Sequence, residues 1–290
     1  MSKMSESNSS TSLMTDKMFR YFGLACTVFA LMILAFFLIK LLSEGASRID
    51  WTFLSSFPSR SPEKAGIIVP LVGSFYILAL TLVIAIPLGV FSGVYLEEYG
   101  RKSKLNALIE INIANLAGVP SIIYGLLALE IFVRWLGLGK SLLAGALTLS
   151  LLILPVIIVA TREALKAVPK TIREASYALG GTKWQTILHQ VLPAASGGIL
   201  TGVILAMSRA IGESAPLIVI GAMLYISSLP STPLDDFSVL PIQIFNWLSR
   251  PQPGFIINAS AAIIILLVII LILNGLAIYL RNRWQKKVNW

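Results

Sequence analysis

The sequence has few of the residues from which soluble enzymes and metal sites are built. Only 13% of its 290 residues are charged, about half of the roughly 25% that is typical of soluble globular domains. A single cysteine, Cys26, excludes an internal disulfide framework and a zinc site built from cysteines. A single histidine, His189, argues against histidine-based metal or triad chemistry. We therefore expect no metal site, no catalytic residues and no enzymatic activity in this chain.

Hydrophobic residues, in contrast, make up 56% of the sequence and raise its mean hydropathy to +0.83. A membrane helix needs about 20 predominantly apolar residues. Six stretches meet this requirement, and the first is too long for the apolar core of a signal peptide. The sequence therefore predicts an all-α integral membrane protein with six transmembrane helices. The predicted helices span residues 21–42, 67–96, 108–133, 141–160, 197–224 and 256–280.

The basic residues predict the orientation of these helices. Fifteen of the 23 lysines and arginines fall on the side of the membrane that holds both termini and the connections after the second and fourth stretches. Because cytoplasmic loops carry an excess of basic residues, we expect both termini in the cytoplasm, as a disordered tail (1–20) and a basic tail (281–290). The net charge of +9 is then a signal of topology in the lipid bilayer, and we expect no binding to nucleic acid.

The connection after the fourth stretch, residues 161–196, carries a pattern of its own. Pro169 suits the first turn of a helix, which would run over 170–179 and stop at Gly180 in left-handed geometry. A capping-box pattern at 182–185 begins a second helix. The segment is thus predicted to form two short helices rather than a simple loop.

The second of these helices has one apolar face and is expected to end at Pro193, before the fifth stretch. Two interpretations fit this pattern alone: amphipathic helices that lie on the membrane surface, or a docking element for a cytoplasmic partner. The residues of the apolar face are Trp184, Ile187, Leu188, Val191 and Leu192.

The spelling of this segment resembles the EAA loop of ABC-importer permeases. It reads Glu174-Ala175-Ser176, then Gly180 after three residues, then Gln-Val-Leu-Pro at 190–193 after nine more. The serine and the glutamine depart from the family's alanine and isoleucine. In that family the loop sits in a groove of a separate ATPase subunit, so the resemblance implies such a partner. The residues expected at this contact are Glu174, Ala175, Gly180, Trp184, Leu192 and Pro193.

The fifth stretch contains two ionisable residues, Arg209 and Glu213, four positions apart. In a helix this spacing places both side chains on one face, about 6 Å apart. Because ionisable groups are costly within a membrane and mark transport pathways by default, we expect both to line a substrate pathway. The alternative is a structural pair that only locks two helices together. Small residues at every fourth position of the same stretch predict close packing against another helix. They are Gly198, Gly202, Ala206, Ala210 and Ser214.

Residues 208–216, Ser-Arg-Ala-Ile-Gly-Glu-Ser-Ala-Pro, resemble a signature of phosphate-transporter permeases, one branch of the type I ABC importers. The Ser-Ala-Pro ending is similar to the PstA-type member of that permease pair. Segments 95–102, 118–122 and 240–245 also fit this branch. The resemblance implies a type I permease domain over residues 66–280 that transports inorganic phosphate.

The same resemblance implies the other components of a transporter. A PstC-type sister permease would supply the second half of the channel. A PstB-type ATPase dimer would bind ATP on the cytoplasmic face, and a PstS-type binding protein would deliver phosphate from outside. This sequence has no Gly-x4-Gly-Lys-Ser/Thr motif, so we expect no ATP site or other cofactor in this chain. Two alternatives stay open: a permease for another oxyanion (molybdate, sulfate or phosphonate), and an ATP-independent carrier or channel.

Overall fold

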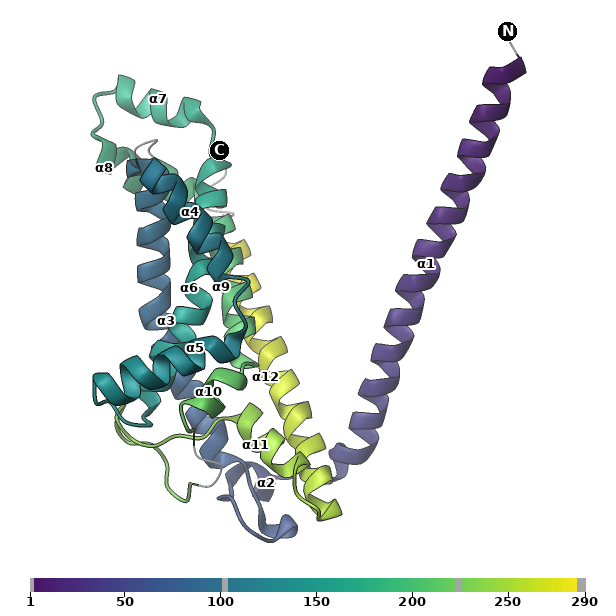
Figure 1. Ribbon diagram of the computed structural model, residues 1–290, viewed down its shortest axis with the longest axis vertical. Coiled ribbons are helices and arrows are strands. Elements are labelled where there is room, and N and C mark those ends of the chain that lie inside the picture. The colour runs from purple at the N-terminus through teal and green to yellow at the C-terminus, as the bar shows by residue number, and fades with distance from the viewer. Residues whose placement is uncertain (1–2, 101–103, 223–225, 286–290) are drawn as a thin grey trace.

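The computed structural model describes residues 3–100, 104–222 and 226–285, and this part of the chain is helical (Figure 1). Five helices are long and apolar enough to cross a membrane, and a sixth crossing results if one sharply bent pair counts as a single span. The predicted all-α membrane architecture is therefore confirmed. The α-helices are α1 (Lys3–Gly45), α2 (Trp51–Ser55), α3 (Ile68–Val94), α4 (Lys104–Leu116), α5 (Ser121–Ala128), α6 (Leu142–Lys166), α7 (Lys170–Ala178), α8 (Lys183–Thr186), α9 (Leu192–Ile211), α10 (Ala215–Val219), α11 (Leu240–Leu248) and α12 (Pro253–Gln285).

Short turns of other helical types join these elements. Two are 3-10 turns, Ala46–Arg48 and Pro62–Lys64, on either side of α2. Three are π-helical turns, in which the backbone is wider than in an α-helix. These are Tyr95–Tyr99, Leu129–Trp135 and Ile187–Val191.

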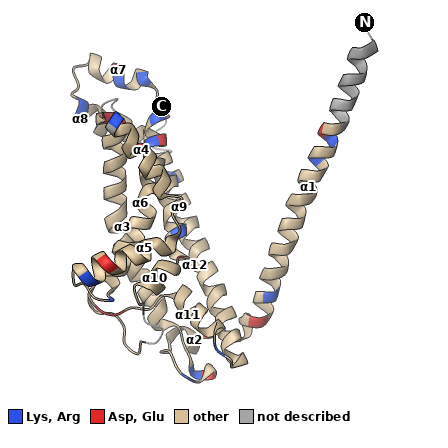
Figure 2. Cartoon of the chain, in the orientation of Figure 1, with Lys and Arg blue, Asp and Glu red and all other residues tan. Residues whose placement is uncertain are grey.

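Helix α6 is the centre of the bundle. It packs against α3 on one side and α9 on the other, and α12 packs in turn against α9. Charged residues gather toward the ends of this bundle, while the middle of α3 and α6 carries none (Figure 2). This is the distribution of charge expected of helices that cross a bilayer, because a charged side chain is costly at its centre.

Two glycines allow α9 to lie close against α6. A Cβ atom added at Gly198 would lie 2.6 Å from the Cβ of Ala164, and one added at Gly202 would collide with Ala160. Ala206 and Ala210 continue the same stripe and are buried. Ser214 does not, because α9 has ended before it and Ser214 instead precedes α10. Small residues thus face α6 along the length of α9.

The third predicted helix, 108–133, is broken. Helices α4 and α5 meet at an angle of 105° across the short segment between Leu116 and Ser121. Pro120 lies in that break, where its ring removes a backbone N–H group and disfavours helical geometry in the residue before it. The hydroxyl of Tyr124 donates to the freed carbonyl of Leu116 at 2.8 Å. The prediction of one uninterrupted helix over 108–133 is therefore wrong, whereas Pro87 and Pro155 do lie inside α3 and α6.

The fifth predicted helix, 197–224, is also wrong in extent. Helix α9 ends at Ile211 and the short α10 follows it. Gly212 has low helix propensity. Pro216 has no N–H group, so it cannot donate the next helical hydrogen bond to the carbonyl of Gly212. Together they interrupt the helix.

Helix α1 begins at Lys3, so residues 3–20 are helical rather than a disordered tail. Extending an existing helix adds one hydrogen bond for each residue that is fixed, which favours continuation of the first membrane helix into a polar segment. In Figure 1, α1 leans away from the bundle and approaches α12 only at its C-terminal end. Positions 1–2, 101–102, 223–224 and 286–290 of the sequence-based predictions lie outside the described residues.

The beginning of α1, the end of α12 and helices α7 and α8 lie at the same end of the molecule (Figure 1). Helices α2 and α11 lie at the opposite end. This arrangement brings together the segments that the basic residues assign to the cytoplasm. The compartment that this end faces stays a prediction.

Candidate coupling surface and transport pathway

The segment 161–196 forms the two predicted helices, α7 and α8, joined by a glycine turn. Gly180 has a φ of +84°, the left-handed geometry that an L side chain avoids. At the start of α8, the backbone N–H of Gln185 donates to the Thr182 hydroxyl at 3.3 Å, and the Gln185 side chain accepts from the Thr182 N–H at 2.9 Å. The predicted glycine stop and capping box are both confirmed.

Pro193 does not end the second of these helices, contrary to the prediction. The π-helical turn Ile187–Val191 joins α8 to α9, so that Lys183–Ile211 forms one helix of 29 residues. Pro193 falls in the first turn of α9, directly after the wider π turn, and local π geometry is one way a helix accommodates a proline. A displacement of α8 would therefore pass directly to the membrane-spanning α9.

Part of the predicted apolar face is used inside the chain itself. Ile187 and Val191 are fully buried in a cluster with Val94 of α3 and Leu165 of α6. Other large apolar side chains of this segment stay exposed, and one of them, on the glycine turn, is 90% exposed. We call these exposed side chains the docking residues: Tyr177, Leu179, Trp184 and Leu188.

The residues that the EAA resemblance singles out are spread along both helices. Glu174, Ala175, Gly180 and Trp184 are exposed, whereas Leu192 and Pro193 are half-buried at the start of α9. Exposure leaves the first four free to contact another subunit. Their role in such a contact stays a prediction.

An ion pair that was not predicted from the sequence holds α7 to the bundle. Arg173 of α7 forms an ion pair with Glu98, at 2.6 Å, in the π-helical turn that extends α3. Beside it, Arg162 of α6 pairs with Glu110 of α4 at 2.8 Å and approaches Glu97 at 3.6 Å. The available signal was the Glu97-Glu98 pair directly after an apolar stretch, with basic residues in a neighbouring connection.

Arg209 and Glu213 do not share a helix face. Arg209 lies in the last turn of α9, and Glu213 lies beyond the end of the helix, in the connection to α10. The two side chains form no ion pair in the structure. The predicted shared helix face is therefore wrong, and the assignment of both residues to a substrate pathway stays a prediction.

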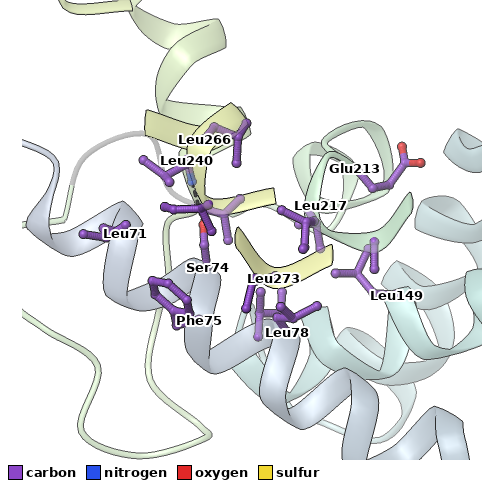
Figure 3. A pocket seen from close by; sticks show the side chains of 15 residues that line it. Leu71, Ser74, Phe75, Leu78, Leu149, Glu213, Leu217, Leu240, Leu266 and Leu273 are labelled. Carbon is purple, nitrogen blue, oxygen red and sulfur yellow. Dashed lines mark hydrogen bonds between the residues drawn. The ribbon is translucent and has the colours of Figure 1, made fainter. Parts of the chain in front are cut away.

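Glu213 lies at the rim of a small apolar cavity (Figure 3). Residues of α3, α6, α9, α10, α11 and α12 line this cavity, most of them apolar, and the carboxylate of Glu213 is directed away from them. Its volume is about 20 Å³, which leaves room for about one water molecule. An oxyanion does not fit in it.

Arg209 itself is exposed, while the residues beside it connect α9 to α12. The hydroxyl of Ser208 donates to the side-chain oxygen of Asn274 at 2.7 Å. Closer to the end that carries α7, Arg281 donates to the hydroxyl of Thr201 at 2.9 Å. These contacts fix α9 against α12 and leave the Arg209 guanidinium on an open face. Asn274, in the middle of the last apolar stretch, was the sequence signal for the first of these contacts.

On the opposite end of the molecule, Asp235 organises a turn in the loop before α11. Its carboxylate accepts hydrogen bonds from the hydroxyl of Thr232 at 2.6 Å and from the N–H groups of Thr232 and Ser231 at 2.9 and 2.7 Å. These bonds, led by that of the Thr232 hydroxyl, hold the pKa of the carboxyl well below its usual range. Asp235 therefore stays ionised and acts as a structural residue of this loop.

Comparison with known families identifies the class of this protein. Residues 85–286 match the family described as "Binding-protein-dependent transport system inner membrane component". The chain belongs to this family and is the membrane-embedded permease subunit of an ABC importer, a multi-pass protein of the cytoplasmic membrane. The predicted resemblance to importer permeases is confirmed.

Individual relatives extend over most of the chain. It is 34% identical to the "Probable ABC transporter permease protein YqgI" of Bacillus subtilis strain 168, across 94% of this chain and 97% of that protein. It is also 34% identical to the "Phosphate transport system permease protein PstA 1" of Mycobacterium tuberculosis strain CDC 1551, across 88% and 84% of the two chains.

Solved structures of other importers share the fold. The inward-facing MetNI methionine ABC transporter matches with a TM-score of 0.57 at 21% identity, across 77% of this chain and 98% of the other. A bacterial ABC transporter involved in alginate import matches with a TM-score of 0.59 at 13% identity, across 78% and 80%. At these identities the likeness concerns the fold alone.

Proposed function

We propose that this chain is the PstA-type permease of an importer for inorganic phosphate. Relatives named as phosphate transport permeases cover most of its length, including one from Haemophilus influenzae at 33% identity over 83% of this chain. The segment 208–216, which resembles the signature of that branch, lies at the end of α9. A PstC-type sister permease, a PstB-type ATPase dimer and a PstS-type binding protein would complete the transporter.

The continuous helix Lys183–Ile211 carries this proposal. Its first turns expose the docking residues Trp184 and Leu188, and its last turn carries Arg209. An ATPase that closes on ATP would push on the first turns and tilt the whole helix, since a helix transmits displacement as a stiff rod. The tilt would move Arg209 and switch the pathway between outward-facing and inward-facing states, a rigid-body transition between two packings.

Arg209 would contact the passing anion. Its planar guanidinium matches two phosphate oxygens at once, and its exposed position on α9 would leave it free to reach a pathway shared with the sister permease. When it is ionised, Glu213 can only accept hydrogen bonds, so it would accept one from the hydroxyl group of hydrogen phosphate. Binding here would be weak, because a pathway has to release what it admits. High affinity would belong to the binding protein.

ATP chemistry would take place in the partner subunits. The role of this chain would be to convert docking motion into movement of the pathway, with no cofactor of its own. The segment 174–193 would be the coupling element, since it holds the exposed turn between α7 and α8 and the beginning of the continuous helix.

Uptake of labelled phosphate into proteoliposomes tests the proposal. They would contain this chain, its sister permease and the ATPase, with binding protein on the extracytoplasmic side and ATP on the other. We expect uptake that requires ATP and that excess sulfate or molybdate does not reduce. ATP-dependent uptake of one of those anions instead would reject phosphate as substrate, and uptake without ATP would reject the coupling scheme.

A further inference from the structure

Arg173 is the central residue of an unassigned cluster where α7 meets the membrane bundle. Its Nε and one Nη atom donate to the same carboxylate oxygen of Glu98, at 3.1 and 2.6 Å. The guanidinium also donates to two backbone carbonyls at the end of α6, that of Leu165 in its last turn at 3.0 Å and that of Val168 just beyond it at 2.9 Å. The Leu165 carbonyl accepts from the Val168 N–H at 3.2 Å as well, so Arg173 adds a second donor there. One side chain of α7 thus binds the ends of both α3 and α6.

This cluster is shielded from solvent although it lies at the surface of the bundle. The Glu98 side chain is 9% exposed and that of Arg173 is 17% exposed. Charge-assisted hydrogen bonds are stronger than neutral ones, and limited access of water and salt reduces their screening. Surface ion pairs elsewhere in the chain, such as Lys166–Glu163 at 44% and 64% exposure, lack this protection.

Helix α7 has few other attachments to the bundle. None of its residues is fully buried. Ser176 reaches only α8, through a 2.8 Å hydrogen bond to the Thr186 hydroxyl, and Ile172 packs at the edge of the apolar cluster around Leu165. Beside the ion pair, residues of α7 and the side chains of Glu97 and Glu98 line an open cavity of about 460 Å³. Among the hydrogen bonds and ion pairs of the described residues, those of Arg173 alone link α7 to the extension of α3.

Helix α8 is attached to the bundle in a different way. Ile187 and Val191 are fully buried against the bundle, and the helix continues into α9. Motion of α8 therefore reaches α9 through the backbone, whereas α7 is linked to the extension of α3 through side chains. The neighbouring Arg162, bound to Glu110 of α4, ties the same π-helical turn to α6.

We propose that Arg173 and Glu98 are positioning residues that tie α7 to α3, so that the two helices move together when the partner ATPase displaces α7. This inference rests on the proposed coupling to an ATPase but not on phosphate as the substrate. Coupling then has two routes, a backbone route through α8 to α9 and an ion-pair route through α7 to α3. Loss of the ion-pair route would leave ATP hydrolysis intact but would reduce the amount of substrate transported for each ATP hydrolysed.

A distance measurement tests the ion-pair route directly. Spin labels would be attached to cysteines at exposed Tyr95, in the extension of α3, and exposed Thr171, on α7, with Cys26 replaced by serine. Pulsed electron resonance on the assembled, reconstituted transporter would compare the nucleotide-free and ATP-bound states. We expect one unchanged distance distribution in the parent, and a shifted or broadened distribution with ATP in Arg173→Gln and Glu98→Gln.

Transport per ATP hydrolysed gives the second readout. In each variant the amount of substrate transported per ATP hydrolysed should fall by roughly threefold or more, which is within the range by which single residues modulate coupling. The double variant should lose no more than the more severe single variant, because the two substitutions remove one contact. Lys166→Gln, which breaks the exposed pair on the same end, is the matched control and should change neither readout.

The outcomes separate this inference from the proposed function. A parent-like label distance and parent-like transport per ATP in both Arg173→Gln and Glu98→Gln would overturn the ion-pair route. Since Glu98→Gln preserves the shape of the side chain and a hydrogen-bond acceptor, it serves as the milder variant where Arg173→Gln fails to assemble. Absence of ATP-dependent phosphate uptake in the parent would reject phosphate, while the label distances would still test the ion-pair route.

Discussion

At the scale of single residues, the open position of Arg209 distinguishes it from every arginine that the bundle uses structurally. Arg162 and Arg173 are enclosed by carboxylates and carbonyls, whereas Arg209 has no ion-pair partner among the described residues and is exposed at the end of α9. A guanidinium without an ion-pair partner in this part of the chain is free to bind a transient anion. Its value then depends on the fork-shaped array of donors and not on charge alone.

Arg209→Lys should therefore reduce ATP-dependent uptake although the positive charge is kept. Lysine cannot bind two oxygens through one rigid plane, and losing one charged hydrogen bond corresponds to roughly a tenfold loss. The measurement is the initial uptake rate in proteoliposomes, with co-purification of the partners as the check on assembly. The matched control is Arg134→Lys. Arg134 is an exposed arginine away from α9 that pairs with Glu130 of the same π-helical turn. Uptake at the parent rate in Arg209→Lys would remove Arg209 from the pathway.

The identity of these residues could be read from the sequence, but their geometry could not. An arginine within an apolar stretch is conspicuous, which is why Arg209 and Glu213 stood out. Their shared face depended on an uninterrupted helix, and the interruption comes from Gly212 and Pro216 acting together. The Arg173–Glu98 pair joins positions that are 75 residues apart, and a single sequence shows which residues are charged but not which of them pair.

At the scale of elements, the contact between α6 and α9 depends on the absence of side chains. Gly202→Ala should destabilise the bundle by about 1–3 kcal/mol, since the added methyl group collides with Ala160 in a packed interface. The double variant Gly202→Ala/Ala160→Gly should recover most of this loss, because the volume is only exchanged. Thermal unfolding in detergent is the measurement. Gly275→Ala, on α12 with nothing within 4 Å, should cost nothing, and equal losses in both glycine variants would contradict the packing argument.

The turn between α7 and α8 gives a second prediction at this scale. Gly180→Pro should uncouple ATP hydrolysis from uptake, because proline fixes φ near −65° where the turn has +84°. The two helices would change their relative direction and carry the docking residues with them. Gly137→Pro is the matched control, since Gly137 also has a positive φ, +65°, but lies in another turn. Unchanged transport per ATP in Gly180→Pro would count against docking through this turn.

Prolines show why element boundaries were only partly predictable. Pro120 and Pro193 both sit beside long apolar runs, yet the chain breaks at one and continues as a helix through the other. The difference lies in what precedes them. A π-helical turn comes before Pro193, whereas a glycine-containing turn comes before Pro120. The capping box and the glycine stop were predicted correctly, because each depends only on residues that are neighbours in the sequence.

At the scale of the whole molecule, the bundle has two chemically different ends. One end gathers α7, α8, the beginning of α1 and the end of α12, and the other carries α2, α11 and the Asp235 turn (Figures 1 and 2). An importer needs this polarity, because ATP is available on one side of the membrane and the substrate arrives from the other. The excess of basic residues assigns the end with α7 to the cytoplasm. The orientation is thus the assumption on which both coupling routes depend.

Labelling of single cysteines in intact cells tests this orientation. With Cys26 replaced by serine, a membrane-impermeant maleimide should react with cysteines at exposed Arg60 and Ser228, on the end opposite α7. Cysteines at exposed Thr171 and Leu179 should react only after the cells are permeabilised. The four positions are all accessible to solvent in the structure, so differences in rate report the membrane and not burial. The reverse pattern would place α7 and the docking residues outside, where no ATPase could reach them, and both coupling routes would fail together with the assigned topology.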